Sequence, residues 1–281
     1  MPAAEVPGHV TAEDSRGWLT SRDPVAVLVV LLVAAFAAWL VTIQRMQGMD
    51  AGPGTDLGAF GWYLGVWVTM MAAMMLPSVA PMVLAFSRLA ADRARRGRRF
   101  VPTWVFAGGY LLAWTAYGIV AYGVFRLIRT LDLGVLDWDR GGPWIAGGAV
   151  AAAGVYQLSP LKRVCLNHCR TPLHFLVHGW HEGWGGALRM GLVHGAYCVG
   201  CCWGLMVILF ALGVMSVFWM ALVAAVIFLE KVTPVGARLP RASAVLFVAF
   251  GLAIAIAPGA VPGLTEPDDE PGMTQMDRMA P

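Results

Sequence analysis

The chain has 281 residues, of which 58% are hydrophobic and only 13% are charged, and its formal net charge is +3. A soluble domain usually has about a quarter of its residues charged. The apolar residues form runs longer than ~18 residues, which is too long for strands and typical of membrane-spanning helices. The composition therefore predicts an all-α, polytopic transmembrane helix bundle in contact with the lipid bilayer, and it excludes a soluble barrel.

Seven apolar stretches are predicted as transmembrane helices, with six as the alternative count. A polar tail over residues 1–23 precedes a helical domain over 24–257. The first stretch contains Ala35-Phe36-Ala37, which resembles a signal-peptide cleavage site, but the apolar run continues to Ile43 and predicts an uncleaved helix. The predicted helices cover residues 24–43, 59–84, 101–127, 143–158, 186–212, 215–230 and 242–257. Residues 258–281 are predicted to be a disordered acidic tail that contains Met273, Met276 and Met279.

Basic residues are concentrated in three connections of this plan. Six arginines and one aspartate lie between Arg88 and Arg99, and further basic residues lie at 162–170 and 231–241. With seven helices, all three connections fall on one side of the membrane. The positive-inside rule then predicts that the N-terminus is cytoplasmic and the C-terminus is outside. The net charge says little about partners, because the clustered basic residues report membrane topology rather than nucleic-acid binding. No nucleic-acid module and no Walker phosphate loop is present to indicate a nucleic-acid or nucleotide partner.

Cysteine and histidine are gathered in one part of the chain. Ten of the eleven such residues lie between Cys165 and Cys202, and only His9 lies outside. Thiol and imidazole are the ligands that zinc, copper and iron prefer. This clustering predicts that the functional centre of the protein is a transition-metal site in this stretch.

The stretch divides into a cytoplasmic Cys/His loop at about 160–185 and a group inside the fifth helix. In the loop, Cys165, His168 and Cys169 are predicted as an accessible metal-exchange site. His174, His178 and His181 follow at helical spacing, where an ordinary amphipathic surface helix is an equal alternative. In the fifth helix, the members of one broad face are predicted as the buried metal ligands: His194, Cys198, Cys201 and Cys202.

The second helix has a methionine face. Met71, Met75 and Met82 recur at helical spacing together with Ser78, and Pro77 and Pro81 are expected to kink the helix. Thioether sulfur is a soft ligand that selects Cu(I). We expect this face to line or complete the metal site if it meets the fifth helix, although methionine is also ordinary packing material in membrane helices.

Four stretches together resemble a bacterial family of predicted metal-binding integral membrane proteins that contain a domain of unknown function. They are residues 70–82 (MMAAMMLPSVAPM), 156–162 (YQLSPLK), 165–170 (CLNHCR) and 194–203 (HGAYCVGCCW), joined by Glu230-Lys231 with Pro234 and Gly236. The resemblance covers about residues 60–255 and implies a multi-pass protein of the bacterial cytoplasmic (inner) membrane. This chain has Ser216 where the family tends to have asparagine.

Four functions fit these residues. The favoured one is binding of a soft transition metal, with copper as Cu(I) favoured over zinc, in metal handling or trafficking with a metal donor or acceptor protein. The alternatives are a membrane thiol–disulfide redox protein, a haem or metallo-oxidase subunit with His194 as an axial ligand, and a purely structural bundle in which Glu230-Lys231 only anchors a helix. No catalytic residues are predicted, and a role other than an enzyme is favoured. Metal affinity is expected to fall at acid pH, because the thiols must lose their protons.

Overall fold

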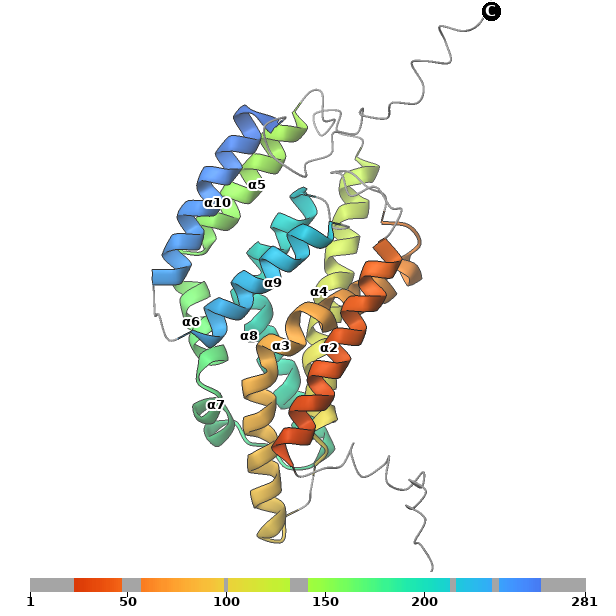
Figure 1. The fold of residues 1–281 in the computed structure, drawn as a ribbon, viewed down its shortest axis with the longest axis vertical. Coiled ribbons are helices and arrows are strands. Elements are labelled where there is room, and N and C mark those ends of the chain that lie inside the picture. Colours follow the sequence, from red (N-terminus) through yellow and green to blue (C-terminus); the bar gives the residue numbers. More distant parts are fainter. Residues whose placement is uncertain are drawn as a thin grey trace, which may run out of the picture.

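The computed structural model describes residues 23–46, 57–98, 101–131, 141–212, 216–233 and 238–258. Within this part of the chain all regular structure is helical (Figure 1). The helices are α2 (Pro24–Met46), α3 (Phe60–Arg95), α4 (Thr103–Thr130), α5 (Gly142–Tyr156), α6 (Pro160–Arg170), α7 (Pro172–His178), α8 (Gly183–Leu212), α9 (Val217–Val232) and α10 (Arg238–Ile256). The predicted all-α bundle is confirmed. The acidic tail with its three methionines, like almost all of the N-terminal tail, lies outside the described residues.

Each of the seven predicted ranges contains a helix, but the helices differ in length. Five are long and apolar enough to cross a membrane, namely α2, α3, α4, α8 and α10. The other two, α5 and α9, have 15 and 16 residues, and a spanning helix needs about 20. Length and composition thus support five of the seven predicted spans. The predicted 160–185 loop is itself largely helical, because it contains α6 and α7.

The α3 helix is 36 residues long and ends at Arg95, well beyond the predicted end at residue 84. Much of the basic 88–99 segment is therefore helix rather than loop. The turn that follows contains Gly97 with a φ of 80°, the left-handed conformation that glycine adopts without steric cost. The extension brings basic residues to the start of α8, where Arg98 lies 3.3 Å from Glu182.

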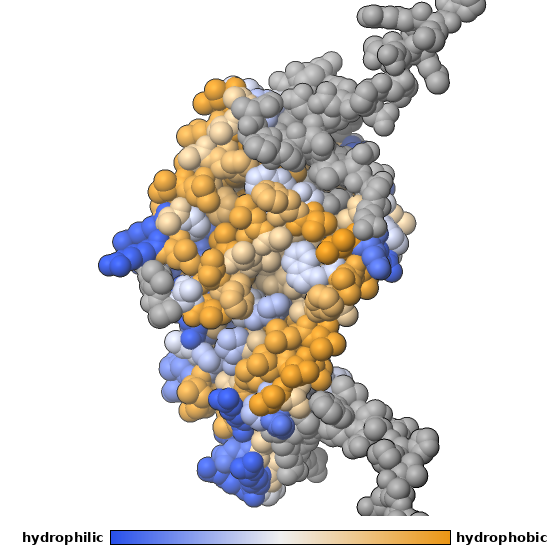
Figure 2. Space-filling model, in the orientation of Figure 1, coloured by the Kyte–Doolittle hydropathy of each residue, from blue (hydrophilic) through white to orange (hydrophobic). Residues whose placement is uncertain are grey.

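Two helices form the interior of the bundle. In the most apolar 18-residue stretch of each helix, 61% of α3 and 56% of α8 are buried, compared with 17% of α2 and 11% of α4. The outer helices expose large apolar side chains such as Phe36, Val120 and Val245. Figure 2 shows apolar residues over much of one face and hydrophilic residues at the lower end of α3 and the start of α10. A hydrophobic exterior of this extent is typical of a surface that contacts lipid.

Glycines allow the central helices to approach closely. A Cβ atom on Gly109 of α4 would lie 2.4 Å from the Leu188 carbonyl oxygen of α8, and one on Gly191 would lie 2.1 Å from the Phe106 carbonyl oxygen. The α5–α10 pair uses Gly147 in the same way. Small residues at helix contacts are characteristic of membrane bundles, in which close backbone packing replaces the hydrophobic effect. This packing fixes the position of α8, which carries the cysteine group.

Candidate metal centre

Three thiols of α8 meet at one point inside the bundle. The sulfur atoms of Cys198, Cys201 and Cys202 all lie within 4.8 Å of one another, and all three side chains are buried. The sulfur atoms of Cys201 and Cys202 are 3.2 Å apart. Spacings of three and four residues place side chains on one helix face, which explains why a single helix can supply all three. Among the described residues, this is the one group of three or more thiol, imidazole or carboxylate side chains close enough to share an ion.

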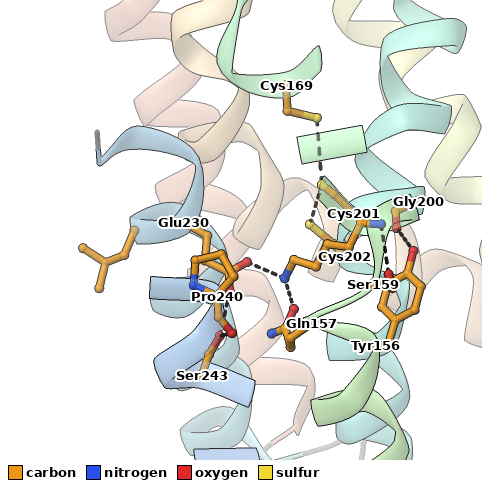
Figure 3. A network of polar contacts seen from close by, with 12 residues as sticks. Tyr156, Gln157, Ser159, Cys169, Gly200, Cys201, Cys202, Glu230, Pro240 and Ser243 are labelled. Carbon is orange, nitrogen blue, oxygen red and sulfur yellow. Dashed lines mark hydrogen bonds and ion pairs between the residues drawn. The ribbon is translucent and has the colours of Figure 1, made fainter. Parts of the chain in front are cut away.

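A fourth thiol comes from α6. The Cys169 sulfur lies 3.9 Å from the Cys201 sulfur, and Figure 3 shows the Cys169 side chain pointing from its helix toward Cys201. All five cysteines of the chain are free thiols. The sequence predicted two separate sites, one in the loop and one in the fifth helix. The structure places Cys169 beside the α8 thiols instead, because α6 folds back against α8.

The other two residues predicted in the loop lie apart from this group. Cys165 packs against α8, where a Cβ atom on Gly200 would lie 2.7 Å from its sulfur. Burial raises the pKa of the Cys165 thiol, which favours its protonated form. His168 is half-buried, and its ring stacks on the Tyr197 ring with 4.2 Å between centroids. Cys165 therefore packs against α8 outside the group of three thiols, and a ligand role for Cys165 and His168 stays a prediction.

Polar side chains surround Cys198. The Lys231 ammonium donates hydrogen bonds to the Cys198 sulfur over 2.9 Å and to the Ser78 hydroxyl over 3.1 Å. The Tyr110 hydroxyl lies 3.0 Å from the same sulfur, and Tyr110 is completely buried. A cation beside a sulfur is an arrangement that stabilises thiolate. Sequence reasoning missed both partners, because a lysine near a helix end and a tyrosine among apolar residues look like interfacial anchors.

A cavity of about 170 Å³ adjoins the thiols. Its lining comes from α3, α6, α7, α8 and α9 and includes Ser78, Met82, Cys169, Arg170, His194 and Lys231. His194 is 2% exposed, and its Nδ1 atom is buried without a hydrogen-bond partner. An unpartnered buried polar atom is costly, and it is expected where a ligand or ion completes the site. Cys169 belongs both to the wall of this cavity and to the thiol group.

The methionine face of α3 is buried. Met71 and Met75 are both fully inaccessible, and Met82 lines the cavity. However, α3 packs mainly against α2, α4 and α9 rather than α8. Met82 is thus placed with His194 and Cys169 in the cavity wall, whereas a ligand role for Met71 and Met75 stays a prediction.

Beside the centre lies a buried charged network. The Lys162 ammonium lies 2.6 Å from a Glu230 carboxylate oxygen, and both side chains are at most 2% exposed. Ser243 donates to the other carboxylate oxygen over 2.9 Å, and Lys162 also bonds to Gln157 (Figure 3). Lys162 was predicted as a basic loop residue, which is wrong, because it is buried. Glu230 does anchor α9 through its ion pair with Lys162, whereas the side chain of the neighbouring Lys231 contacts the Cys198 thiol.

The three other histidines among the described residues lie on the surface. His174 and His178 are one turn apart in α7, with 4.4 Å between ring centroids, and both are exposed. The helix ends at His178, so His181 does not continue the predicted stripe. His181 instead lies 2.7 Å from Arg189. The stripe is therefore reduced to one exposed pair.

The fold and the buried centre define a class of protein, namely an all-helical bundle with several candidate membrane spans and an internal group of soft metal ligands. The chain belongs to a copper chaperone family, since the family model PpoB2, described as a copper chaperone, matches residues 64–254. This range begins within α3, ends within α10 and contains all four grouped cysteines. No curated protein and no solved structure matches the chain. This match confirms the prediction that the chain belongs to a metal-binding family.

Proposed function

We propose that this protein binds Cu(I) through Cys198, Cys201, Cys202 and Cys169 and transfers it to or from a partner. The observation that carries the proposal is the approach of three buried thiols to within 4.8 Å of one another, with a fourth thiol 3.9 Å from Cys201. Thiolates are the preferred ligands of Cu(I) in proteins. The copper chaperone family of the chain supports the same metal.

Four thiols also suit zinc, which is held tetrahedrally by four ligands in structural sites. Two features favour copper over zinc. Met82 brings a thioether to the cavity beside Cys169 and His194, and thioether is a ligand of soft copper rather than of zinc. In addition, the cavity gives the centre a route for exchange, which a closed structural zinc site does not need. His194 and Met82 are proposed as ligands that hold the ion during its passage, with Met71 and Met75 deeper along the α3 face.

The membrane of this protein is proposed to be the bacterial inner membrane, with the N-terminus inside and the C-terminus outside. The basic segments support this orientation, because they meet on one side of the fold. Arg98 of the α3–α4 connection reaches Glu182 before α8, and Arg170 at the end of α6 donates to the Glu230 carbonyl oxygen near the end of α9. The orientation can be tested with single cysteines at Arg96 and Leu131, which are exposed at opposite ends of α4. An impermeant maleimide should label Arg96→Cys only in inverted vesicles and Leu131→Cys only in right-side-out ones.

Copper binding is tested by loading purified protein with Cu(I) under reducing, anaerobic conditions and measuring retained metal after desalting. The wild type should retain copper with sulfur ligands visible by X-ray absorption. The Cys198/Cys201/Cys202→Ser variant should lose it, and Cys169→Ser should weaken it. Cys165→Ser is the matched control, because it removes a thiol of the same segment that lies outside the group. Equal retention by the wild type and the triple variant would refute the proposal.

A further inference from the structure

The cavity next to the thiols carries an unusual charge for a site that receives a metal cation. Two of its lining side chains are basic, Arg170 and Lys231, and none of the described residues that line it is acidic. The carboxylate of Glu230, next to Lys231 in α9, is already neutralised by Lys162 at 2.6 Å. A bare cation would therefore enter against a positive potential, whereas an anion would enter with it.

Both basic groups are held in place by the protein. Arg170 donates to the Glu230 carbonyl oxygen over 2.7 Å, and this carbonyl is fixed by the last turn of α9. Lys231 is held between Ser78 of α3 and Cys198 of α8. The positive charge is thus built into the junction of four helices, and it is not a consequence of flexible surface side chains.

From this arrangement we infer that the copper enters the cavity as a small anionic thiolate complex, Cu(SR)₂⁻, and not as a free or cationic ion. The inference rests on the proposed function and specifies its substrate class. A cavity of about 170 Å³ admits a small thiol and not the loop of a donor protein. The basic lining attracts the complex and then stabilises the thiolate that leaves it.

The transfer is a ligand exchange in which copper stays Cu(I). One thiolate of the group attacks copper and displaces RS⁻, which departs past Arg170 and Lys231. A second, protonated thiol of the group then forms the second Cu–S bond, and its proton goes to the remaining carrier thiolate, which leaves as RSH. In total, Cu(SR)₂⁻ and one thiolate–thiol pair give a dithiolate-bound copper, RS⁻ and RSH. Charge, protons and oxidation state balance without a further reactant.

Cys169 is placed to meet the complex first. It lies in the cavity wall and its sulfur is 3.9 Å from that of Cys201. His194, with its unpartnered Nδ1, faces the same cavity and offers a neutral ligand to the ion in transit. The complex therefore meets a thiol, a neutral ligand and a positive lining at one point.

The inference is tested with three carriers of similar size that bind Cu(I) through one thiol but differ in the charge of the tail. They are 3-mercaptopropionate, 2-mercaptoethanol and cysteamine, with anionic, neutral and cationic tails. Stopped-flow loading of the purified protein should be fastest from mercaptopropionate and slowest from cysteamine, with about a tenfold spread that shrinks in high salt. Equal loading rates from all three carriers, or the reverse order, would overturn the inference.

Variants of the protein test whether Lys231 causes the dependence of the loading rate on the charge of the carrier's tail. Lys231→Met should reduce the spread between the three loading rates, and Lys231→Arg should preserve this spread. Arg96→Gln is the control, because Arg96 is an exposed arginine outside the cavity lining and its loss should leave the order unchanged. If Lys231→Met does not fold, the wild-type order alone decides. Failure of the wild type to retain copper from any carrier would refute the proposed function, whereas retention with rates independent of tail charge would refute only this inference.

Discussion

Lys231 donates a hydrogen bond from its ammonium group to the sulfur of Cys198 over 2.9 Å. The two residues come from α9 and α8 and are separated by 33 positions in the chain. Lysine is rarely placed inside a bundle without a partner, and here its partners are a thiol and the Ser78 hydroxyl. The ammonium supplies positive charge at the point where a bound Cu(I) dithiolate would carry negative charge.

Replacement of Lys231 by methionine should weaken equilibrium Cu(I) binding by about 10- to 100-fold, since a hydrogen bond to a charged group contributes about 1.5–3 kcal/mol. Affinity is measured by competition with a chromophoric Cu(I) chelator. Lys231→Arg should retain most of the affinity, because it keeps the charge. An unchanged affinity in Lys231→Met, with copper still bound to sulfur, would mean that the lysine has no part in holding the metal.

Copper retention should depend on pH. Protons compete with the metal for thiolate sulfur, so the apparent affinity should rise as pH rises and fall as pH falls, by up to about tenfold per pH unit for each proton released. The measurement is the same chelator competition at a series of pH values, with the chelator's own titration subtracted. The Cys165→Ser variant should follow the wild-type curve. A flat curve would indicate that the ion is not held by thiols.

The sequence was sufficient to predict the helical bundle and the gathering of thiols on α8. Long apolar runs leave few other folds, and the spacing of Cys198, Cys201 and Cys202 places them on one face in any α-helix. Neither conclusion depends on how the helices pack. The length of α3 was underestimated because a basic helical end and a basic loop have the same composition.

The partners from other helices could not be predicted in this way. Cys169, Tyr110 and Lys231 reach the α8 thiols only because α6, α4 and α9 fold around α8, and a single sequence contains no signal for such contacts. Lys162 was misassigned for a related reason. A lysine next to a helix end usually marks a cytoplasmic loop, and only the position of Glu230 on a distant helix makes its burial tolerable.

The Lys162–Glu230 pair makes a testable contribution to stability. Glu230→Gln removes the countercharge and leaves a buried ammonium group, which should reduce the free energy of unfolding by about 3 kcal/mol or more. The measurement is denaturation in mild detergent, followed by circular dichroism. Asp92→Asn is the control, because it breaks a 3.0 Å pair with Arg96 that is exposed and contributes less than about 1 kcal/mol. A Glu230→Gln effect no larger than that of the control would contradict the assignment.

The close contact of α4 and α8 provides the last test, because α4 contains two adjacent glycines in opposite environments. A Cβ atom on Gly109 would lie 2.4 Å from the Leu188 carbonyl oxygen, whereas one on Gly108 would meet nothing within 4 Å. Gly109→Ala should therefore separate the helices and destabilise the protein by about 1–3 kcal/mol. Gly108→Ala should be neutral or stabilising by up to about 1 kcal/mol, because alanine is the better helix former.

The same pair of variants links packing to the metal centre. Displacement of α8 from α4 would also separate Cys198 from the Tyr110 hydroxyl, which now lies 3.0 Å away. Gly109→Ala should thus change the rate of Cys198 alkylation in a variant that retains this single cysteine, whereas Gly108→Ala should not. Equal stability and equal alkylation rates for the two variants would show that the α4–α8 contact does not control the geometry of the thiols.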